Sequence, residues 1–191
     1  MTNPPYEVAW GSRNPDNLNY SRPTGFRFNI FILPKVNFFC QSVTLPGMTL
    51  GVANQISPLA DIPWPGEKLT FDTLNLKFII QSDWANYIEL YNWFIGLGDP
   101  TSNDQYQKWI DSHSWRAPNT KNASTIAQFS DATLTILSAN NVPTTQIQFQ
   151  NLFPVGIQGV EFDIAEGRTQ YLTVMASFKY QYFIPTTLQV S

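Results

Sequence analysis

The sequence predicts a mainly β protein, an antiparallel β-sandwich or barrel with one flanking α-helix, and three observations lead to this prediction. Strand-length stretches of alternating apolar and polar residues fill both halves of the chain. Only one stretch, residues 83–97, repeats apolar residues at convincing helical spacing. With 191 residues, 43% of them hydrophobic, the chain can bury one sizeable core. Strand-rich halves around one helix indicate sheets packed on each other with the helix on their flank.

The chain is predicted to divide into an arm, one domain and a tail. Residues 1–22 are rich in Asn, Pro and Ser without periodicity, which predicts an arm, either disordered or laid along a partner. Residues 23–184 are expected to form a single β domain, and 185–191 a C-terminal tail. Within the domain, 99–131 is interpreted as a loop insertion, because so short a stretch cannot build a core unaided.

The first strand is predicted at residues 25–33, where aromatic and aliphatic side chains alternate with polar ones. Residues 36–45 are its expected antiparallel partner, joined to it by a short connection at Pro34-Lys35. The turn dipeptide Pro46-Gly47 ends this second strand.

Residues 46–68 are predicted to form a long loop, because a central strand does not tolerate the proline spacing of this segment. Loops of this length are usually functional or disordered. The apolar residues in this loop argue against disorder, so we expect them to be buried in another subunit. Loop tryptophans of the 99–131 insertion are expected at protein contacts as well. The candidate interface residues are therefore Met48, Val52, Ile56, Leu59, Ile62, Trp64, Trp109 and Trp115.

A strand is predicted at 69–80, where the apolar alternation shifts phase midway, as at a β-bulge. The helix at 83–97 follows, with Ser82 or Asp83 as its N-cap. A short helix is compatible with residues 105–112. The stripe of the main helix that is expected to pack against the sheet consists of Trp84, Tyr87, Ile88, Tyr91, Phe94 and Ile95.

The last third of the chain is predicted to be β again. Residues 132–138 and 145–149 flank a hairpin connection at 140–143. Residues 153–164 are a further predicted strand, with two glycines that are typical of bends or bulges. The stretch 171–183 alternates throughout and is predicted to be one unusually long strand. Long strands leave bare edges, a liability unless another chain pairs with them.

The sequence contains no catalytic constellation, so the chain is predicted not to be an enzyme and no metal or cofactor is expected. His113 is the only histidine, which excludes a multi-histidine metal site. Cys40, the only cysteine, is interpreted as a small core residue. Glu161 and Asp163 are interpreted as part of a solvated acidic face. No phosphate-binding glycine loop, nucleophile elbow or zinc spacing occurs.

Charged residues make up 13% of the chain, about half of the ~25% usual in soluble domains. Few charges with many aromatic residues are typical of interfaces, and equally of β proteins with a Thr/Asn/Gln surface. The net charge of −3 gives no sign of a nucleic-acid binder, which usually has a basic patch. With no signal peptide and no apolar run long enough to span a membrane, we expect a soluble protein made in the cytosol.

Several stretches occur in a recognisable order: FFCQSVTLPG at 38–47, IPWPGEKLTFDTLNLKF at 62–78, a helix, and NLFPVGIQGVEFDI…YLTVMASFKYQYF at 151–183. In this order they resemble the tail tube proteins of contractile-tailed bacteriophages. The resemblance covers residues 22–98 and 130–184.

The resemblance implies a structural virion protein whose copies form a ring, hexameric in the family, and whose rings stack into a tube. DNA passes through such a tube without specific binding, and a slightly acidic chain suits this conduit because basic lumen residues would bind phosphates. Partners implied are further copies and other tail proteins such as sheath, baseplate or terminator. The location implied is the virion tail, assembled in the host cytoplasm; both a tube subunit and a tube-like baseplate, neck or terminator component fit.

The residues leave one alternative from a different class of protein. Trp64, Trp109 and Trp115 lie in predicted loops, where they could line a sugar-binding groove. This alternative is a carbohydrate-binding module on a virion or cell surface.

Overall fold

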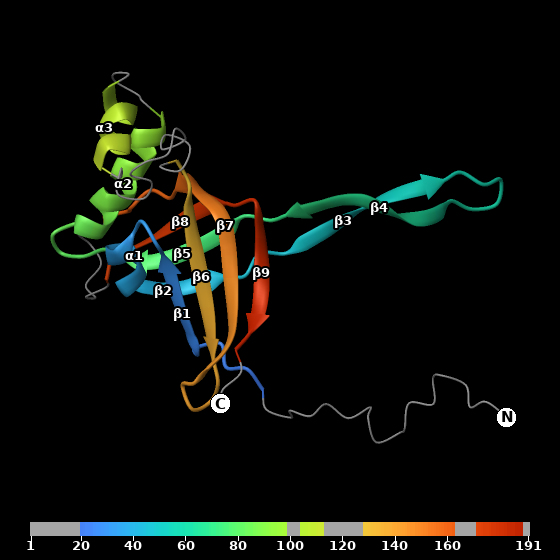
Figure 1. The fold of residues 1–191 in the computed structure, drawn as a ribbon, viewed down its shortest axis with the longest axis horizontal. Coiled ribbons are helices and arrows are strands. Elements are labelled where there is room, and N and C mark those ends of the chain that lie inside the picture. The colour runs from blue at the N-terminus through green and yellow to red at the C-terminus, as the bar shows by residue number, and fades with distance from the viewer. Residues whose placement is uncertain (1–19, 99–103, 113–127, 163–170, 189–191) are drawn as a thin grey trace.

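The computed structural model describes residues 20–98, 104–112, 128–162 and 171–188 (Figure 1). A body of packed strands carries helices at one end, and a long two-stranded hairpin projects from it. The elements are β1 (Phe26–Ile30), α1 (Pro34–Phe38), β2 (Cys40–Thr44), β3 (Met48–Gln55), β4 (Ile62–Phe71), β5 (Leu74–Ile79), α2 (Ala85–Gly98), α3 (Asp104–Ser112), β6 (Ser130–Leu137), β7 (Pro143–Ile157), β8 (Thr173–Lys179) and β9 (Tyr182–Thr187).

The body is a seven-stranded antiparallel sheet in the order β1-β6-β7-β8-β5-β2, with β9 paired to β7. The first part of β7 lies between β6 and β9, whereas its last residues pair with β8. Between these parts Asn151 has a φ of 54°, a left-handed conformation that turns the strand. One strand therefore joins two packed halves. The end strands β1 and β2 do not pair, so the sheet is not closed into a barrel, but the predicted mainly β, antiparallel fold class is confirmed.

The core lies between the two halves of the sheet. Alternate residues of the central strands are buried, as half-buried strands require. Trp93 of α2 is fully buried and packs on Phe178 of β8, with the ring centroids 6.2 Å apart. The largest fully buried side chains are Trp93, Phe78, Phe149, Phe178, Ile30, Leu33, Leu74, Leu76, Leu90, Leu152, Val36 and Val174.

The predicted pairing of residues 25–33 with 36–45 is wrong. Pro34 begins the short helix α1, a position that suits proline because its missing N–H is not needed there. In this helix Asn37 bonds the edge of β1: its Oδ1 accepts from the N–H of Ile30 (2.7 Å) and its Nδ2 donates to the carbonyl of Ile30 (2.8 Å). The chain therefore crosses the fold, and β1 pairs with β6 while β2 pairs with β5.

The C-terminal strands are divided differently from the prediction. The β6–β7 hairpin is present as predicted, but residues 153–157 continue β7 instead of forming a separate strand. The stretch 171–183 is two strands, because the chain leaves β8 at Tyr180 and returns beside β7 as β9. At this break the N–H of Gln181 donates to the carbonyl of Gln150 (3.0 Å). Strand β9 runs to Thr187, into the predicted tail.

The main helix is present, but the predicted apolar stripe is only partly right, because Trp84, Tyr87 and Phe94 pack half-buried against the core while other members do not. Ile88 and Tyr91 are about half exposed, and the residues that α2 buries are Asn86, Leu90, Trp93 and Gly96. Asn86 is buried because it satisfies two backbone groups: its Oδ1 accepts from the N–H of Gln81 (3.2 Å) and its Nδ2 donates to the carbonyl of Ile79 (2.7 Å). At the helix start, Asp83 Oδ1 accepts from the N–H of Ala85 (3.1 Å).

The compatible short helix at 105–112 is present as α3, which packs against α2. A Cβ atom at Gly96 would lie 2.5 Å from Cγ of Trp109, closer than real contacts allow. Glycine at position 96 therefore lets the Trp109 ring lie directly on α2, and Trp109 is buried. The described residues contain three helices, of which only α1 was not anticipated from the sequence.

Candidate assembly surfaces

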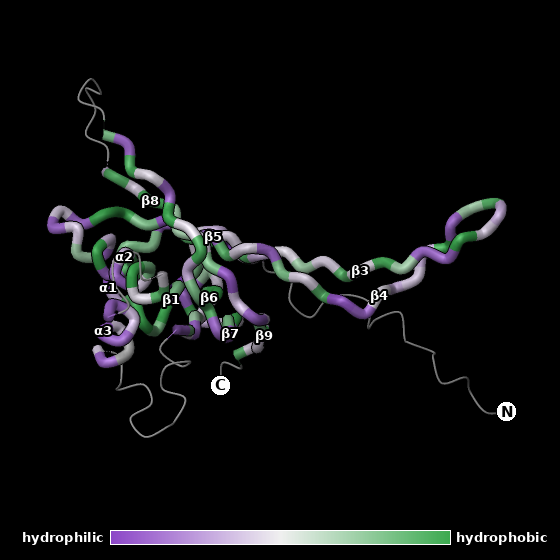
Figure 2. Tube along the Cα trace, turned by 90° about the horizontal axis from the view of Figure 1, so that it is seen from above, coloured by the Kyte–Doolittle hydropathy of each residue, from purple (hydrophilic) through white to green (hydrophobic). Residues whose placement is uncertain are grey.

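The segment predicted as a loop at 46–68 is instead a β-hairpin, β3–β4, which pairs only with itself and projects from the body (Figures 1 and 2). The prolines do not prevent strand formation here. Pro63 and Pro65 occupy alternate positions of β4, opposite Asn54 and Val52. Alternate positions share one edge of a strand, and the outer edge of β4 has no partner strand, so no ladder bond is lost. The predicted strand at 69–80 accordingly divides into the end of β4 and the whole of β5.

Two glycines bring the hairpin strands close together near the middle of its length. A Cβ atom at Gly66 would lie 2.7 Å from the carbonyl oxygen of Gly51. The register shifts between Leu50 and Val52 at the same place, which marks a β-bulge. Bulges bend a strand and increase its twist, so this crossing sets the direction of the outer hairpin.

The base of the hairpin is fixed to the core. The N–H of Asp72 donates to the carbonyl of Gly47 (3.1 Å) and closes the root of the ribbon. Phe71 packs against Tyr180 and Phe183, with ring centroids 5.9 and 5.6 Å apart. The root is therefore held by aromatic contacts, whereas the ribbon beyond it has no layer of the described chain packed upon it.

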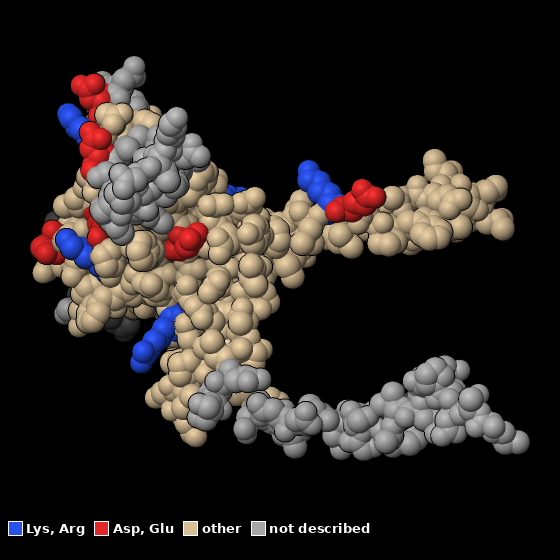
Figure 3. All heavy atoms as spheres, viewed as in Figure 1, with Lys and Arg blue, Asp and Glu red and all other residues tan. Residues whose placement is uncertain are grey.

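Apolar side chains cover the hairpin and face solvent. Its only charged residues before Asp72 are Asp61, Glu67 and Lys68, and Figure 3 shows most of its visible surface without charge. The indole N–H of Trp64 donates to Oε1 of Gln55 (3.1 Å), which orients a ring that is 56% exposed. The register puts Val52, opposite Pro65, and Trp64, opposite Ala53, on opposite sides of the ribbon, so both sides expose apolar side chains. Exposed apolar surface of this kind marks an interaction site. The large exposed apolar residues of the hairpin, on both of its sides and here together called the hairpin face, are Met48, Leu50, Val52, Ile56, Leu59, Ile62, Trp64 and Leu69.

Six of the eight predicted interface residues lie on this face. Sequence reasoning missed Leu50 and Leu69, because only the strand pairing places them beside the others. Trp109 lies elsewhere, on the side of α3 that packs against α2, and is buried there, so the folded subunit does not expose it. Trp115 lies outside the described residues.

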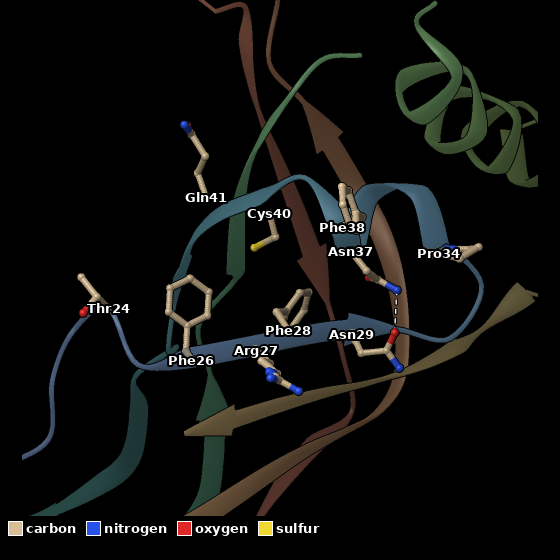
Figure 4. A pocket seen from close by; sticks show the side chains of 10 residues that line it. All are labelled: Thr24, Phe26, Arg27, Phe28, Asn29, Pro34, Asn37, Phe38, Cys40 and Gln41. Atoms are coloured by element: carbon tan, nitrogen blue, oxygen red, sulfur yellow. Dashed lines mark hydrogen bonds between the residues drawn. The ribbon is translucent and has the colours of Figure 1, made fainter. Parts of the chain in front are cut away.

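The second candidate surface is the groove between β1 and β2, two strands that do not pair with each other (Figure 4). It has a volume of about 630 Å³ and is bounded at one end by α1. Phe26, Phe28 and Cys40 point into the space between the two strands. Burial raises the pKa of the Cys40 thiol to about 11, which makes it a poor nucleophile at neutral pH.

The titratable groups of the described residues form no reactive cluster. No group of three or more His, Cys, Asp or Glu side chains comes close enough there to hold a metal ion. Burial raises the pKa of Glu89, although the backbone N–H of Lys35 bonds its Oε2 (3.2 Å). Glu161 is exposed, while its predicted companion Asp163 and the single histidine, His113, fall outside the described ranges. Within those ranges, no helix is both long enough and apolar enough to cross a membrane.

The fold is therefore a two-layer antiparallel β structure with a projecting hairpin, and its candidate sites are surfaces suited to contact with other molecules. The family described as phage tail tube protein matches residues 6–186, nearly the whole chain. The chain therefore belongs to the phage tail tube protein family.

Solved structures of contractile injection systems share this fold. The tube-terminating cap of the anti-feeding prophage aligns with a TM-score of 0.57 at 11% identity, over 95% of this chain and 100% of that chain. A chain from the sheath–tube complex of the extracellular contractile injection system PVC, in its extended state, aligns with a TM-score of 0.55 at 9% identity, over 88% and 93%. The PVC sheath/tube terminator aligns with a TM-score of 0.55 at 13% identity, over 89% and 99%. A comparison with curated protein sequences finds no match.

Proposed function

We propose that the protein forms a ring in a phage tail, as the tube subunit or as a tube-like component of the baseplate, neck or terminator. Six copies surround a passage through which DNA moves without specific binding. The observation that carries the proposal is the hairpin face, a set of large apolar side chains that the described chain leaves uncovered. Family membership supports the proposal, because it names the tail tube as the setting.

The hairpin is built to contact another molecule. An isolated two-stranded ribbon is marginal in water, so its stability in place depends on its root and on a surface that covers it. Strand β3 has eight residues, which at ~3.3 Å per residue extend about 26 Å from the body. A second copy placed beside or above this subunit lies within that reach. Burial of the hairpin face against it would remove apolar area from water on both partners.

Strand edges supply the second means of assembly. Within the described residues, β1, β2 and β9 each have one edge without a strand partner. Exposed edges favour pairing with another chain, and a head-to-tail contact that closes makes a ring. The low charge of the chain suits a passage for DNA, because nucleic acid is held mainly by Lys and Arg contacts to phosphate. Sheath, baseplate and terminator proteins are the further partners we propose, with assembly in the host cytoplasm and a final location in the virion tail.

Native mass spectrometry of the purified protein at rising concentration tests the ring, and negative-stain electron microscopy shows its form. We expect hexamers that appear as rings with a central opening. Indefinite stacking would identify the tube subunit, whereas rings that stop at one or two layers would identify a terminator or baseplate component. A folded monomer at every concentration, with tail partner proteins added, would overturn the proposal.

No observation favours the alternative, a carbohydrate-binding module. Trp64 lies on the projecting hairpin, whereas Trp109 belongs to α3, at the other end of the molecule, and is buried against α2 (Figure 1). These two tryptophans therefore do not line a common groove in the described subunit.

A further inference from the structure

The groove between β1 and β2 is a hollow with aromatic walls, formed in part by Phe26 and Phe28 (Figure 4). Its volume of about 630 Å³ lies within the ~300–1,000 Å³ usual for sites that take a ligand-sized group. Past Phe26 it continues into a second hollow of about 530 Å³, lined by Val43 and Leu134. Among the strands of the described chain, none pairs with the groove-side edge of β1 or of β2. The groove can therefore receive an apolar projection.

The tip of the β3–β4 hairpin is such a projection. Residues 56–61 read ISPLAD and join the two strands. Leu59 is 98% exposed and Ile56 88%, more than any other large aliphatic side chain of the described residues. Side chains exposed to this degree contribute almost nothing to the core of their own subunit. Two of them at the end of a narrow ribbon suit insertion into a concave surface on another molecule.

The charges of the two surfaces are complementary. Asp61 is the only charged residue of the tip. Arg27 lines the groove and Arg22 lines the hollow beyond it, and none of the described residues that line either space is acidic. Opposite charges steer two surfaces together and disfavour wrong partners.

The occupant of the groove has to come from a second copy. The hairpin begins at Met48, shortly after β2 ends at Thr44 beside the groove. The eight residues of β3 then carry the tip about 26 Å out from the body (Figure 1). A subunit therefore holds its tip away from its own groove. Because tip and groove are different surfaces, a contact between them is head-to-tail, and its repetition makes a ring or an open stack.

We propose that the hairpin tip of one subunit inserts into the β1–β2 groove of a second copy. Ile56 and Leu59 lie against the aromatic walls, and Asp61 faces the arginines of the groove. The inference rests on the proposed assembly of identical copies and adds to it the site that receives the hairpin.

A cross-link between two engineered thiols tests this contact. In a Cys40→Ser background, Gln41→Cys places a thiol at the exposed edge of the groove, and Leu59→Cys places one on the tip. The matched controls are the two single variants and the pair Leu59→Cys with Ile184→Cys. Ile184 is 44% exposed on β9, which lies three strands away from β1. Each protein is mildly oxidised at a concentration where copies associate, and is then separated on a denaturing gel without reductant.

We expect the groove–tip pair to give a ladder of linked species larger than a dimer, because every copy can link to two neighbours. The single variants should give no ladder, and the Ile184 pair should link far less. Equal linking of both pairs would overturn the proposed site. So would an absence of links in the groove–tip pair while native mass spectrometry shows oligomers, a result that would leave the ring itself standing. A disulfide within one monomer would also overturn the site, because the tip would then occupy its own groove. Monomers at every concentration would overturn the ring and this contact together.

A second variant measures the same contact without cross-linking. Leu59→Asp places a charge against the aromatic walls, so we expect association to weaken by at least about tenfold. The urea midpoint of the monomer should stay unchanged, because Leu59 is exposed in the single subunit. Association at the wild-type concentration would contradict the proposal.

Discussion

Replacement of Trp64 by alanine is expected to weaken assembly much more than folding. The Trp64 ring belongs to the hairpin face, is 56% exposed, and donates one exposed hydrogen bond to Gln55. Loss of an exposed side chain usually changes the free energy of unfolding by no more than about 0.5 kcal/mol. If a neighbouring copy covers the ring, the same substitution removes its full burial from the interface.

The size of the interface effect follows from the exposed area. A tryptophan offers up to about 250 Å² of surface, so 56% exposure leaves about 140 Å² for a partner to bury. At ~25 cal/mol per Å², this burial contributes about 3.5 kcal/mol. Since 1.4 kcal/mol corresponds to a factor of ten, the association constant should fall about 300-fold for each subunit interface that the ring no longer fills.

The assay is the concentration at which rings form, measured by sedimentation velocity, together with the urea midpoint of the monomer. Tyr91→Ala is the matched control, because Tyr91 is an aromatic residue that is 50% exposed but lies on α2, away from the hairpin. We expect Tyr91→Ala to form rings at the wild-type concentration. Equal weakening by both substitutions, or a Trp64→Ala monomer that has lost its fold, would refute the reasoning.

Three further predictions concern the subunit itself. Gly96→Ala should push Trp109 away, at a cost to stability of about 1–3 kcal/mol that exceeds the ~1 kcal/mol gained in helix propensity. Hydrogen exchange of the α3 backbone should therefore accelerate, and unchanged protection would contradict the tight contact. Asn86→Leu leaves the carbonyl of Ile79 and the N–H of Gln81 without their hydrogen-bonding partner. The free energy of unfolding, measured in urea, should fall by at least about 1–3 kcal/mol. A neutral result would show that water replaces the amide. Because burial raises the Cys40 pKa from 9.0 to about 11, alkylation of this thiol at pH 8 should be about 100-fold slower in the folded chain than in urea, and equal rates would refute this. The contribution of the thiol to stability should be lost as pH rises from 9 through 11.

The parts of the fold that sequence reasoning predicted well are local in the chain. The β6–β7 hairpin follows from alternation on both sides of a turn, and the turn residue Asn141 adopts a φ of 59°, as the residue type allows. The pairing of β1 with β6 was not predictable in this way. The pattern of residues 25–33 does not indicate which strand pairs with them, and adjacency in sequence favoured residues 36–45. In the structure, Asn37 instead occupies the edge of β1 at Ile30, and β1 pairs with β6.

Helix α2 shows a second limit, because it is apolar on more than one side. Choosing the stripe with the most aromatic residues selected Ile88 and Tyr91, which are exposed. The buried side instead contains Asn86 and Gly96, whose burial depends on a backbone partner and on Trp109 in another helix. Neither of these reasons for burial can be inferred from the hydrophobicity of the helix residues.

The candidate surface was located from the sequence while its conformation was not. Prolines in 46–68 argued correctly against a central strand, but an isolated ribbon has an outer edge where prolines cost nothing. The spacing of Pro63 and Pro65 by two residues was the available signal, because it keeps both on that edge. The apolar residues were expected to lack cover in their own domain, and within the described residues they are exposed.

The distant pairing of the first strand has a consequence for biosynthesis. Phe26 of β1 pairs with Ile136 of β6, more than a hundred residues further along the chain. At ~5–20 residues per second, the ribosome needs on the order of ten seconds to make the partner after it has made β1. During that time the sequence FRFNIFIL leaves the exit tunnel with no strand to join. The nascent chain is therefore most prone to aggregation before β6 emerges, and chaperones that bind early apolar segments should associate with it in this interval.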